Sequence, residues 1–314
     1  MPDSFFRPAG AATSISYEGE TSTRVLKFVL ALVFYAYDTA RSLVRRLAGT
    51  EIAPPLVVLM YHSVKRDECE RFARQIDQLI RLAHPVYADF QGQKSDHRRQ
   101  VAVTFDDGYR SVLENALPIL RERRIPATLF VPTQHLGKSP GWITDDRHRD
   151  AGERILTADE LRHMRDAGAL IGSHGVTHRP LTQLSDRDAL AELADSRRQL
   201  AGILGQDVKL FALPYGAGSD DIVRLAASAG YTRLFLNVPV HRVSSGDPVV
   251  GRIEVSPTDW PLEYRLKIRG AYQWLPWAMA TKRRVMNVLR RFTLKGLRRA
   301  RPRMGVRAPN SAVN

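Results

Sequence analysis

The sequence has very little cysteine: Cys69 is the only one among 314 residues. One cysteine cannot form an intrachain disulfide, so cysteine usage indicates neither an oxidising nor a reducing compartment. The sequence also lacks any segment that repeats with a fixed period. With 44% hydrophobic residues, a chain of this length can bury one core of about 200 residues and carry flanking segments.

A hydrophobic run long enough to cross a membrane is missing as well. The run Phe28–Tyr37 has ten apolar residues, whereas a spanning helix needs about 20. Extending it to Val25–Leu47 adds charged residues along one helical side and apolar residues along the other. We therefore expect a helix that lies in a membrane interface or packs on the folded domain. No small-residue cleavage site of a secretory signal follows this run, and residues 1–22 are expected to be disordered.

Acidic residues are absent from the end of the chain. Residues 265–314 hold 14 of the 47 Lys and Arg residues and no Asp or Glu, so the rest of the chain carries 33 of each sign. Within this segment, Trp274 and Trp277 precede an apolar helical stripe. The stripe comprises Val285, Val288, Leu289 and Phe292. This pattern predicts a basic amphipathic helix on an anionic membrane surface. A solvated tail and a clamp for a polyanionic glycan have a similar composition; a nucleic-acid arm does too, although we do not expect nucleic acid as the partner.

Among the residues that are present, two short stretches combine metal-ligand types. Thr104–Gly108 reads Thr-Phe-Asp-Asp-Gly, and His174–His178 has histidines at both ends. A pair at i, i+4 can turn two imidazoles onto one side of a helical turn, and one aspartate can complete a two-histidine, one-carboxylate set around a divalent ion. The other aspartate is then free for proton transfer. Taken alone, each stretch is more often a surface histidine pair or an ordinary turn.

The positions of these stretches strengthen the metal-site interpretation. Each follows a short apolar run, residues 101–105 and 169–173, that is typical of a buried strand. The runs 56–61 and 208–213 likewise end at polar or turn residues. In parallel α/β folds, ligand and catalytic groups collect at the carboxyl ends of the strands, so these segments should open onto one rim. Helical patterns alternate with the runs, which favours parallel α/β architecture. They cover residues 111–124, 157–168, 185–204 and 219–230.

With these motifs, the sequence resembles the polysaccharide deacetylase family, whose members share the NodB homology domain. Members carry T-F-D-D-G, H-[ST]-x-x-H, R-x-P-Y-type and L-x-x-H motifs on a distorted (β/α) barrel with about seven strands. The resemblance covers roughly residues 52–256 and implies that fold, here with N- and C-terminal helical extensions. We expect residues 1–50 to form a disordered N-terminus and an apolar or amphipathic helix. Residues 51–256 should form the catalytic domain, and residues 257–314 a basic amphipathic tail.

The resemblance also implies roles for individual residues. Asp107, His174 and His178 would hold a divalent metal ion, in the first place zinc, with nickel, cobalt or manganese as alternatives. Asp106 would be the general base, and the backbone N–H of Tyr215 would help hold the oxyanion. A metal-bound carboxylate has its lone pairs committed and is a poor base, which is why two adjacent aspartates are needed.

The sequence departs from the family pattern at the acid motif. No L-x-x-H follows residue 216, whereas Leu59–His62 fits it at the front of the domain. The first and last strands of a closed barrel are neighbours, so a motif can change its place in the sequence and keep its place in space. This arrangement is similar to the permuted branch that includes deacetylases of poly-N-acetylglucosamine. We expect His62 to protonate the departing amine; the alternative is a structural histidine at the end of a buried strand.

A second departure concerns the arginine that pairs with the base in many relatives. Ala212 stands at its place, and Arg252 is the candidate to orient Asp106 from another strand, although a purely structural Arg252 remains open. Trp142 lies in a long loop over residues 133–156, where it could stack on a sugar ring or act as a hydrophobic plug.

These observations predict a metal-dependent hydrolase that removes an N-acyl group, first of all acetyl, from an amino sugar of a polysaccharide or glycolipid. The alternatives are a deformylase or deacetylase of a lipid-linked aminosugar and a carbohydrate-binding pseudoenzyme. The expected partners are an N-acetylated glycan or lipid-linked sugar and, through the basic tail, an anionic membrane surface. We expect peripheral membrane association, on a face that the sequence leaves open.

Overall fold

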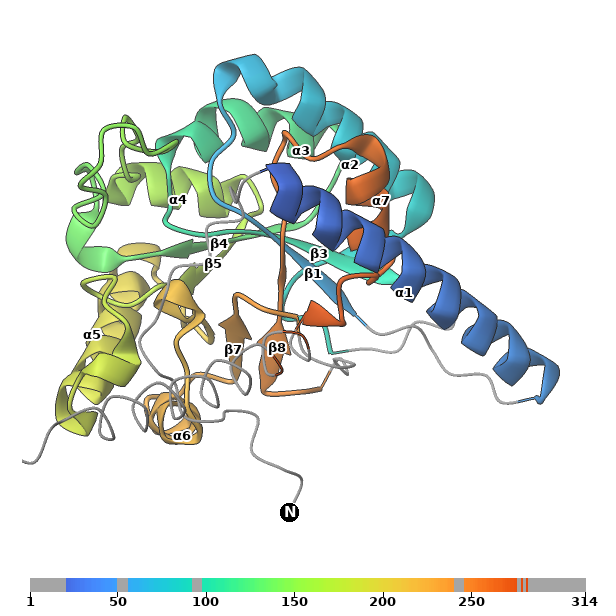
Figure 1. The fold of residues 1–314 in the computed structure, drawn as a ribbon. Helices are drawn as coiled ribbons and strands as arrows, with labels where there is room; N and C mark the ends of the chain where they lie inside the picture. The colour runs from blue at the N-terminus through green and yellow to red at the C-terminus, as the bar shows by residue number, and fades with distance from the viewer. Residues whose placement is uncertain are drawn as a thin grey trace, which may run out of the picture. The chain divides into compact units, whose positions relative to one another are not determined.

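The computed structural model describes residues 21–49, 56–91, 98–239 and 246–275, together with Ala278 and Thr281. Parallel strands and helices alternate along this part of the chain (Figure 1). The strands are β1 Val57–Tyr61, β2 His84–Val86, β3 Gln100–Phe105, β4 Ala127–Val131, β5 Leu170–Ser173, β6 Leu210–Ala212, β7 Arg233–Leu236, β8 Val249–Gly251 and β9 Ile253–Glu254. The α-helices are α1 Thr21–Leu47, α2 Cys69–Leu82, α3 Leu117–Glu122, α4 Ala158–Asp166, α5 Asp186–Leu204, α6 Asp220–Ser228 and α7 Pro261–Ile268.

The described strands form one sheet in the order β8-β7-β6-β5-β4-β3-β1-β9, with β2 paired to β3 off this path. Every pairing is parallel. Both faces of such a sheet are covered, so its strands are apolar along their whole length. All five residues of β1 and of β4 are buried, as this rule requires.

The two ends of the sheet meet at Arg252. This residue alone separates β8, which pairs with β7, from β9, which pairs with β1. One extended residue spans about 3.3 Å, so the two edges must lie side by side and the sheet almost closes. Because β8 and β9 are one continuous segment, seven strand positions surround the barrel. The predicted distorted (β/α) barrel of about seven strands is confirmed.

The helices begin where the sequence indicates. Thr157 caps α4 as a capping box, accepting from the Glu160 N–H while the Glu160 side chain accepts from the Thr157 N–H. Ser185 and Ser219 accept hydrogen bonds from the first turns of α5 and α6. The segment expected as one helix over residues 111–124 is instead a π-helical turn, Val112–Ala116, followed by α3.

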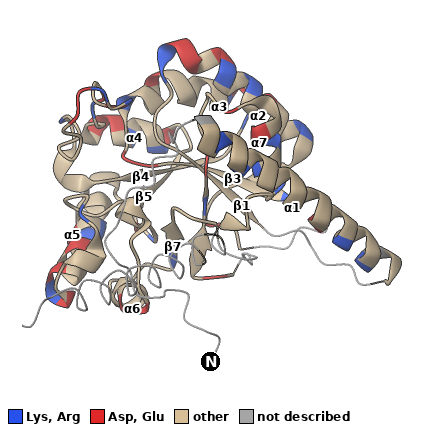
Figure 2. Ribbon diagram, viewed as in Figure 1, with Lys and Arg blue, Asp and Glu red and all other residues tan. Residues whose placement is uncertain are grey.

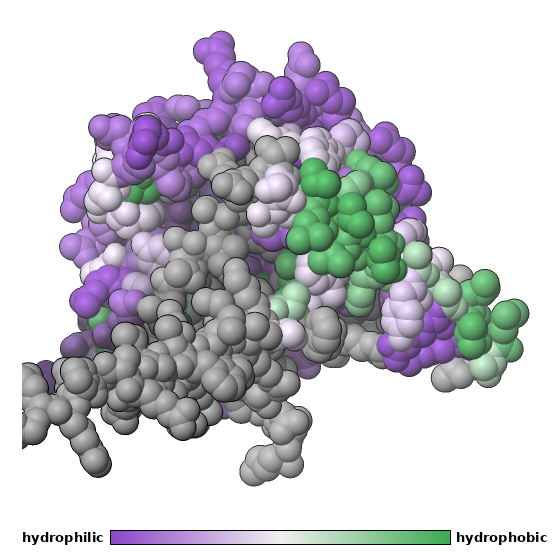
Figure 3. All heavy atoms as spheres, viewed as in Figure 1, coloured by the Kyte–Doolittle hydropathy of each residue, from purple (hydrophilic) through white to green (hydrophobic). Residues whose placement is uncertain are grey.

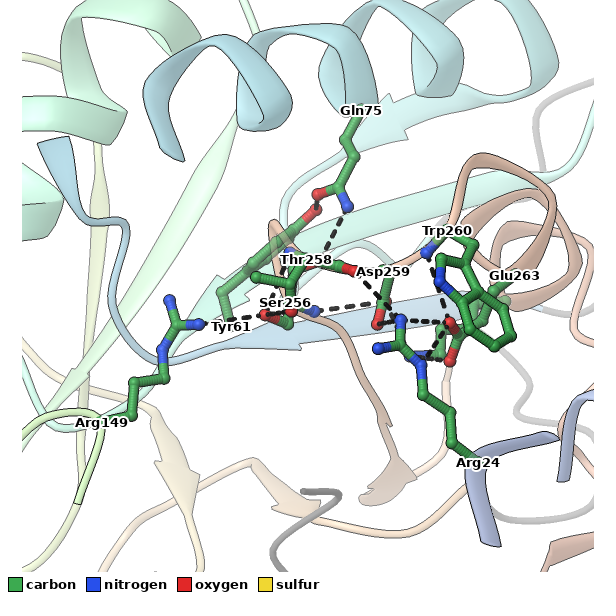
Figure 4. A network of polar contacts seen from close by, with 10 residues as sticks. Arg24, Tyr61, Gln75, Arg149, Ser256, Thr258, Asp259, Trp260 and Glu263 are labelled. Carbon is green, nitrogen blue, oxygen red and sulfur yellow. Dashed lines mark hydrogen bonds and ion pairs between the residues drawn. The ribbon is translucent and has the colours of Figure 1, made fainter. Parts of the chain in front are cut away.

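Polar contacts join α1 to α7 and α7 to the segment that precedes it (Figure 4). Arg24 of α1 donates from Nε and Nη2 to one carboxylate oxygen of Glu263, at 3.1 and 2.7 Å. Lys267 of α7, whose side chain is 3% exposed, donates to Asp259 at 2.7 Å. The chain divides after Trp274 into two units. The compact unit thus continues past residue 256, where the sequence suggested a boundary, because α7 is buried against it.

Among the described residues, no helix is both long and apolar enough to cross a membrane. Helix α1 covers the segment for which an interfacial or domain-packed helix was expected. Disorder was expected over residues 1–22; residues 1–20 lie outside the described residues, and residues 21 and 22 belong to α1, so for these two the prediction is wrong. The apolar stripe from Val285 to Phe292 lies outside the described residues. The membrane role of the tail therefore stays a prediction.

Candidate functional site

Strand β3 delivers two aspartates to the carboxyl edge of the barrel. Asp106 and Asp107 follow Phe105 directly and are 0% and 5% exposed. Asp107 has a left-handed backbone with φ +66°, and Gly108 continues the turn with the same φ. A Cβ at residue 108 would come within 2.9 Å of the Val131 side chain. This turn sends the two neighbouring carboxylates in different directions, as a base and a ligand require.

The histidine pair follows β5 but does not lie on a helical turn, so that part of the prediction is wrong. Residues 174–178 form a loop in which His178 has φ +59°. The loop is held by Glu192 of α5, whose carboxylate accepts from the N–H groups of Val176 and Thr177 at 2.7 and 3.0 Å and from the Thr177 hydroxyl at 2.6 Å. Loop geometry, rather than helical periodicity, brings the two imidazoles together.

Asp107, His174 and His178 form a group whose candidate ligand atoms lie within 4.8 Å of one another. The Asp107 Oδ1 lies 3.1 Å from His178 Nε2 and 3.5 Å from His174 Nε2. His174 Nδ1 is 2.8 Å from the Ala212 carbonyl, to which it donates, so Nε2 keeps a lone pair. Burial raises the pKa of Asp107, but the adjacent His178 outweighs it and leaves that pKa well below the ordinary value. Burial lowers the pKa of His174 to about 4, which keeps its imidazole neutral.

Asp106 is paired with Arg252, as proposed from the sequence. The guanidinium donates from Nη1 and Nη2 to the two carboxylate oxygens, each at 2.6 Å, and both side chains are buried. Arg252 also donates to the Asn237 side chain at 2.8 Å. Burial raises the pKa of Asp106, but the charge and hydrogen bonds of Arg252, together with the nearby His174, outweigh this effect, so this pKa ends below its usual value. Arg252, at the closure between β8 and β9, thus supplies the guanidinium that is missing at Ala212. The role of Arg252 in a reaction stays a prediction.

His62 follows β1 at the same edge, surrounded by carboxylates. Burial lowers the pKa of His62, but the negative charges of Asp107, Glu254, Asp106 and Asp150 outweigh this effect and raise it above the ordinary value. At neutral pH the surroundings therefore favour a proton on His62 and disfavour one on Asp106. Two groups pushed apart in this way are suited to act as acid and base.

Tyr215 completes the rim. Its backbone is left-handed, with φ +58°, and its ring centroid lies 4.9 Å from that of His178. Of the four non-glycine residues with positive φ in the described chain, three, Asp107, His178 and Tyr215, lie at this rim. Such backbone strain concentrates at functional sites. The oxyanion role of the Tyr215 N–H stays a prediction.

The long loop between β4 and α4 reaches the metal-ligand group. Thr133 and Gln134 donate backbone hydrogen bonds to Gly175 and Val176 carbonyls. The Trp142 ring stacks on the His178 ring, with centroids 3.9 Å apart and an interplanar angle of 27°. The His178 ring covers one face of the indole, and Trp142 is half-buried, so both the plug and the sugar platform stay predictions.

The sequence interpretation missed three residues that support the site. Glu192 holds the histidine loop, Asn237 holds Arg252, and Glu254 lies close enough to raise the pKa of His62. None of them belongs to a motif or adjoins one in the sequence, except that Glu254 lies two residues after Arg252. A carboxylate on a buried strand end was the only available signal for Glu254.

Comparisons with known proteins agree with this geometry. A family model described as polysaccharide deacetylase matches residues 93–234. The solved structure of IcaB from Ammonifex degensii has a TM-score of 0.58 and 26% identity, covering 70% of this chain and 97% of that one. The chain is therefore similar to polysaccharide deacetylases in sequence and in fold. The matched segment contains both aspartates and both histidines of the site.

Two curated relatives from this polysaccharide deacetylase family extend the likeness. "Putative polysaccharide deacetylase YxkH" of Bacillus subtilis (strain 168) is 26% identical over 220 residues, 66% of this chain and 74% of the relative. "Poly-beta-1,6-N-acetyl-D-glucosamine N-deacetylase" of Staphylococcus aureus (strain MSSA476) is 28% identical over 170 residues, 51% of this chain. The match spans about half the length of the latter, 55%.

Proposed function

We propose that the protein is a metal-dependent hydrolase that removes the N-acetyl group from an N-acetylated amino sugar, in the first place within a polymer of N-acetylglucosamine. The observation that carries the proposal is the convergence of Asp107, His174 and His178 beside a separate, Arg252-paired carboxylate. The name of the Staphylococcus aureus relatives supports the substrate class. The resemblance at residues 59–62 to the permuted branch supports the same class.

The three proposed ligands fit a divalent cation chemically. One carboxylate and two imidazole nitrogens are a common set for zinc and for other first-row metals. Asp107 Oδ1 and His178 Nδ1 are buried without a hydrogen-bond partner, which is unusual in a folded protein. A cation between the group's ligand atoms would engage the first of these. When bound, it would polarise the acetyl carbonyl and the attacking water.

The other residues then divide the proton transfers. Asp106, ionised beside Arg252, takes a proton as water adds to the acyl carbon. His62, protonated at the start, gives its proton to the nitrogen as the C–N bond breaks. The products are the free amine and acetic acid, which ionises to acetate by releasing a proton to solvent. Asp106 is left protonated and His62 neutral, and a proton passing from Asp106 to His62 through solvent restores the starting state. The Tyr215 N–H is proposed to donate to the oxyanion of the tetrahedral intermediate.

The two alternatives make different demands on the same site. A deformylase or deacetylase of a lipid-linked aminosugar uses the same chemistry on a substrate presented by a membrane. A carbohydrate-binding pseudoenzyme would need neither an ionised Asp106 nor a protonated His62. The opposed pKa shifts of these two groups favour an enzyme.

The test is metal analysis of the purified protein followed by mass spectrometry of glycans after incubation. N-acetylglucosamine oligomers, with N-formyl and lipid-linked aminosugars alongside, should show which acyl loss occurs. We expect one metal per chain. Each deacetylation replaces an acetyl group by hydrogen, so the glycan should lose about 42 Da per acetyl group removed. Bound metal with glycan affinity and no mass change on any substrate would support the pseudoenzyme instead.

A further inference from the structure

Helix α1 exposes apolar residues on an unusual scale. Of the fourteen large hydrophobic residues that are exposed in the described chain, ten lie on this one helix. Six of them follow each other at helical spacing: Leu26, Val29, Val33, Tyr37, Val44 and Leu47. Their exposed fractions run from 47% to 81%. Contiguous apolar surface of this kind on a soluble protein marks an interaction site.

The inward side of α1, which packs against α7, mixes polar, aromatic and small residues. Arg24, Phe28, Ala31, Tyr35 and Asp38 repeat at intervals of three and four residues and are buried or half-buried. Arg24 binds Glu263, and the Phe28 ring meets Trp260 edge-on at 5.7 Å. A helix that stabilises its own domain turns its apolar stripe to the core. Helix α1 packs aromatic and small residues inward and still exposes a second apolar stripe, so packing within the domain does not account for the outward stripe.

The charges beside the stripe have one sign. Helix α1 contains five basic residues, and its single acid, Asp38, lies on the barrel side near Arg99. Burial lowers the pKa of Arg99 to about 10, and the charge of Asp38 opposes this effect. Arg41 is exposed and Arg45 half-buried at the margin of the outward stripe. Figure 2 shows mixed charges over α2, α4 and α5 but few along α1, and Figure 3 shows hydrophobic surface along this helix.

The geometry points to one occupant: we propose that α1 lies in the plane of an anionic lipid bilayer with its outward stripe inserted among the acyl chains. A helix of 27 residues is about 40 Å long and presents a straight apolar edge with basic margins, which matches interfacial helices. Tyr37, 60% exposed, and Trp260, 39% exposed and in contact with Phe28 of α1, add amphipathic rings of the type enriched at membrane interfaces. The Arg24 contacts to Glu263 and the Thr258 carbonyl (Figure 4) hold the helix on the barrel, so docking also orients the barrel.

This surface differs from the basic tail expected to bind anionic lipid. Tail binding would be electrostatic and would disappear in about 1 M salt, where charges are screened within roughly 3 Å. Insertion of the α1 stripe buries apolar area and should persist under those conditions. Lipid binding by the basic tail and lipid binding by the α1 stripe can therefore be distinguished in the full-length chain.

The test uses the full-length protein and flotation with vesicles of phosphatidylcholine, with and without phosphatidylglycerol. Wild type should float with the anionic vesicles at low salt and retain part of its binding at high salt. The triple variant Val29→Gln, Val33→Gln, Val44→Gln should partition about thirtyfold more weakly or worse, because each substitution removes a buried aliphatic side chain. Val33→Gln alone should weaken binding several-fold, whereas the matched control Ile80→Gln, an exposed aliphatic residue of α2, should bind like wild type.

Three results would overturn the proposal. The first is a triple variant that floats like wild type, which would leave the tail as the anchor. The second is a wild-type dimer in sedimentation that the triple variant converts to a monomer, which would make a second copy the occupant. The third is a wild type that binds neither vesicle type while the triple variant loses thermal stability, which would mean that another segment of the chain covers the stripe.

Discussion

The carboxyl rim of the barrel and the outward stripe of α1 depart from the usual burial rule in opposite directions. At the rim, Asp106, Asp107 and Arg252 are charged and buried; on α1, side chains such as Val33 and Val44 are apolar and exposed. Burying a charge is tolerated when it is paired, and at the rim the partners are visible within the protein. The α1 stripe has no such partner among the described residues. The rim is therefore explained by chemistry inside the chain, and the stripe by contact with something outside it.

This comparison predicts that substitutions at the rim change chemistry, whereas substitutions on the stripe change only association. The sharpest case is His178→Ala. It should release the metal and reduce turnover by about a thousandfold or more, because Lewis-acid catalysis is worth several kcal/mol. Metal content and kcat measured together test this. The control is His163→Ala, an exposed histidine of α4; stoichiometric metal and normal turnover in His178→Ala would show that the ligand set is misassigned.

The two aspartates should separate when each becomes an amide. Asp106→Asn should keep the metal and lose turnover by about 10²–10⁴-fold, the usual contribution of a general base. Asp107→Asn should lose metal affinity first, because an amide oxygen is a weaker ligand than a carboxylate. Metal titration of both proteins provides the readout. Equal loss of metal in the two variants would mean that their roles are shared or reversed.

His62→Ala tests whether His62 is the general acid, when substrates with different leaving groups are compared. An amine must be protonated to depart, whereas an activated aryl alcohol need not be. The variant should lose about 10²-fold or more on the N-acetyl substrate and far less on an aryl acetate, with metal content unchanged. An equal loss on both substrates would indicate that His62 has a structural role at the end of β1.

Much of the rim could be predicted from the sequence because each group sits at the end of an apolar strand. Asp106, Asp107, His174 and His62 all follow such runs, and parallel topology then brings them to one edge. The sequence offered Arg252 as a candidate partner of Asp106 but left a purely structural role open, because the pairing depends on the closure between β8 and β9, which periodicity does not show. The loop conformation of His178 and its support by Glu192 were likewise out of reach, because positive φ and long-range contacts are tertiary properties.

The orientation of α1 is the least predictable feature. The sequence separates charged and apolar residues on two sides of Val25–Leu47, but apolar residues lie on both the inward and the outward side of the helix. Hydrophobicity alone therefore does not decide which side meets the domain. The acidic residues Asp259 and Glu263, more than 230 positions away, pair with Arg24 on the inward side, and such long-range contacts are absent from the local pattern.

Glu254→Gln should shift the pH profile without removing a reacting group. The negative charge of Glu254 is among those that raise the pKa of His62. In the proposed mechanism His62 acts in its protonated form, so the rate should fall as pH rises through this pKa. Removing the charge lowers the pKa, and the fall should begin up to about one pH unit earlier. The profile of kcat checks this, with Glu70→Gln, exposed on α2, as control; an unchanged alkaline limb would exclude Glu254 as a tuning residue.

The smallest expected effect is on stability, and it tests the two faces of α1 against each other. Arg24→Ala removes hydrogen bonds to Glu263 and the Thr258 carbonyl and a cation–π contact with Trp260 at 4.5 Å. It should lower the free energy of unfolding by about 1–2 kcal/mol, limited because Lys267 still compensates Asp259 and Glu263.

The matched control is Arg74→Ala, whose exposed ion pair with Glu70 should contribute less than about 0.5 kcal/mol. Val33→Gln on the outward stripe should leave the unfolding free energy of the lipid-free protein within about 0.5 kcal/mol of wild type, as for other surface positions. Urea titration of the three variants measures all of these differences. If Val33→Gln lowers the free energy of unfolding more than Arg24→Ala does, the outward stripe is packed within the protein in solution. The stripe would then have a partner inside the chain, as the charged residues of the rim do.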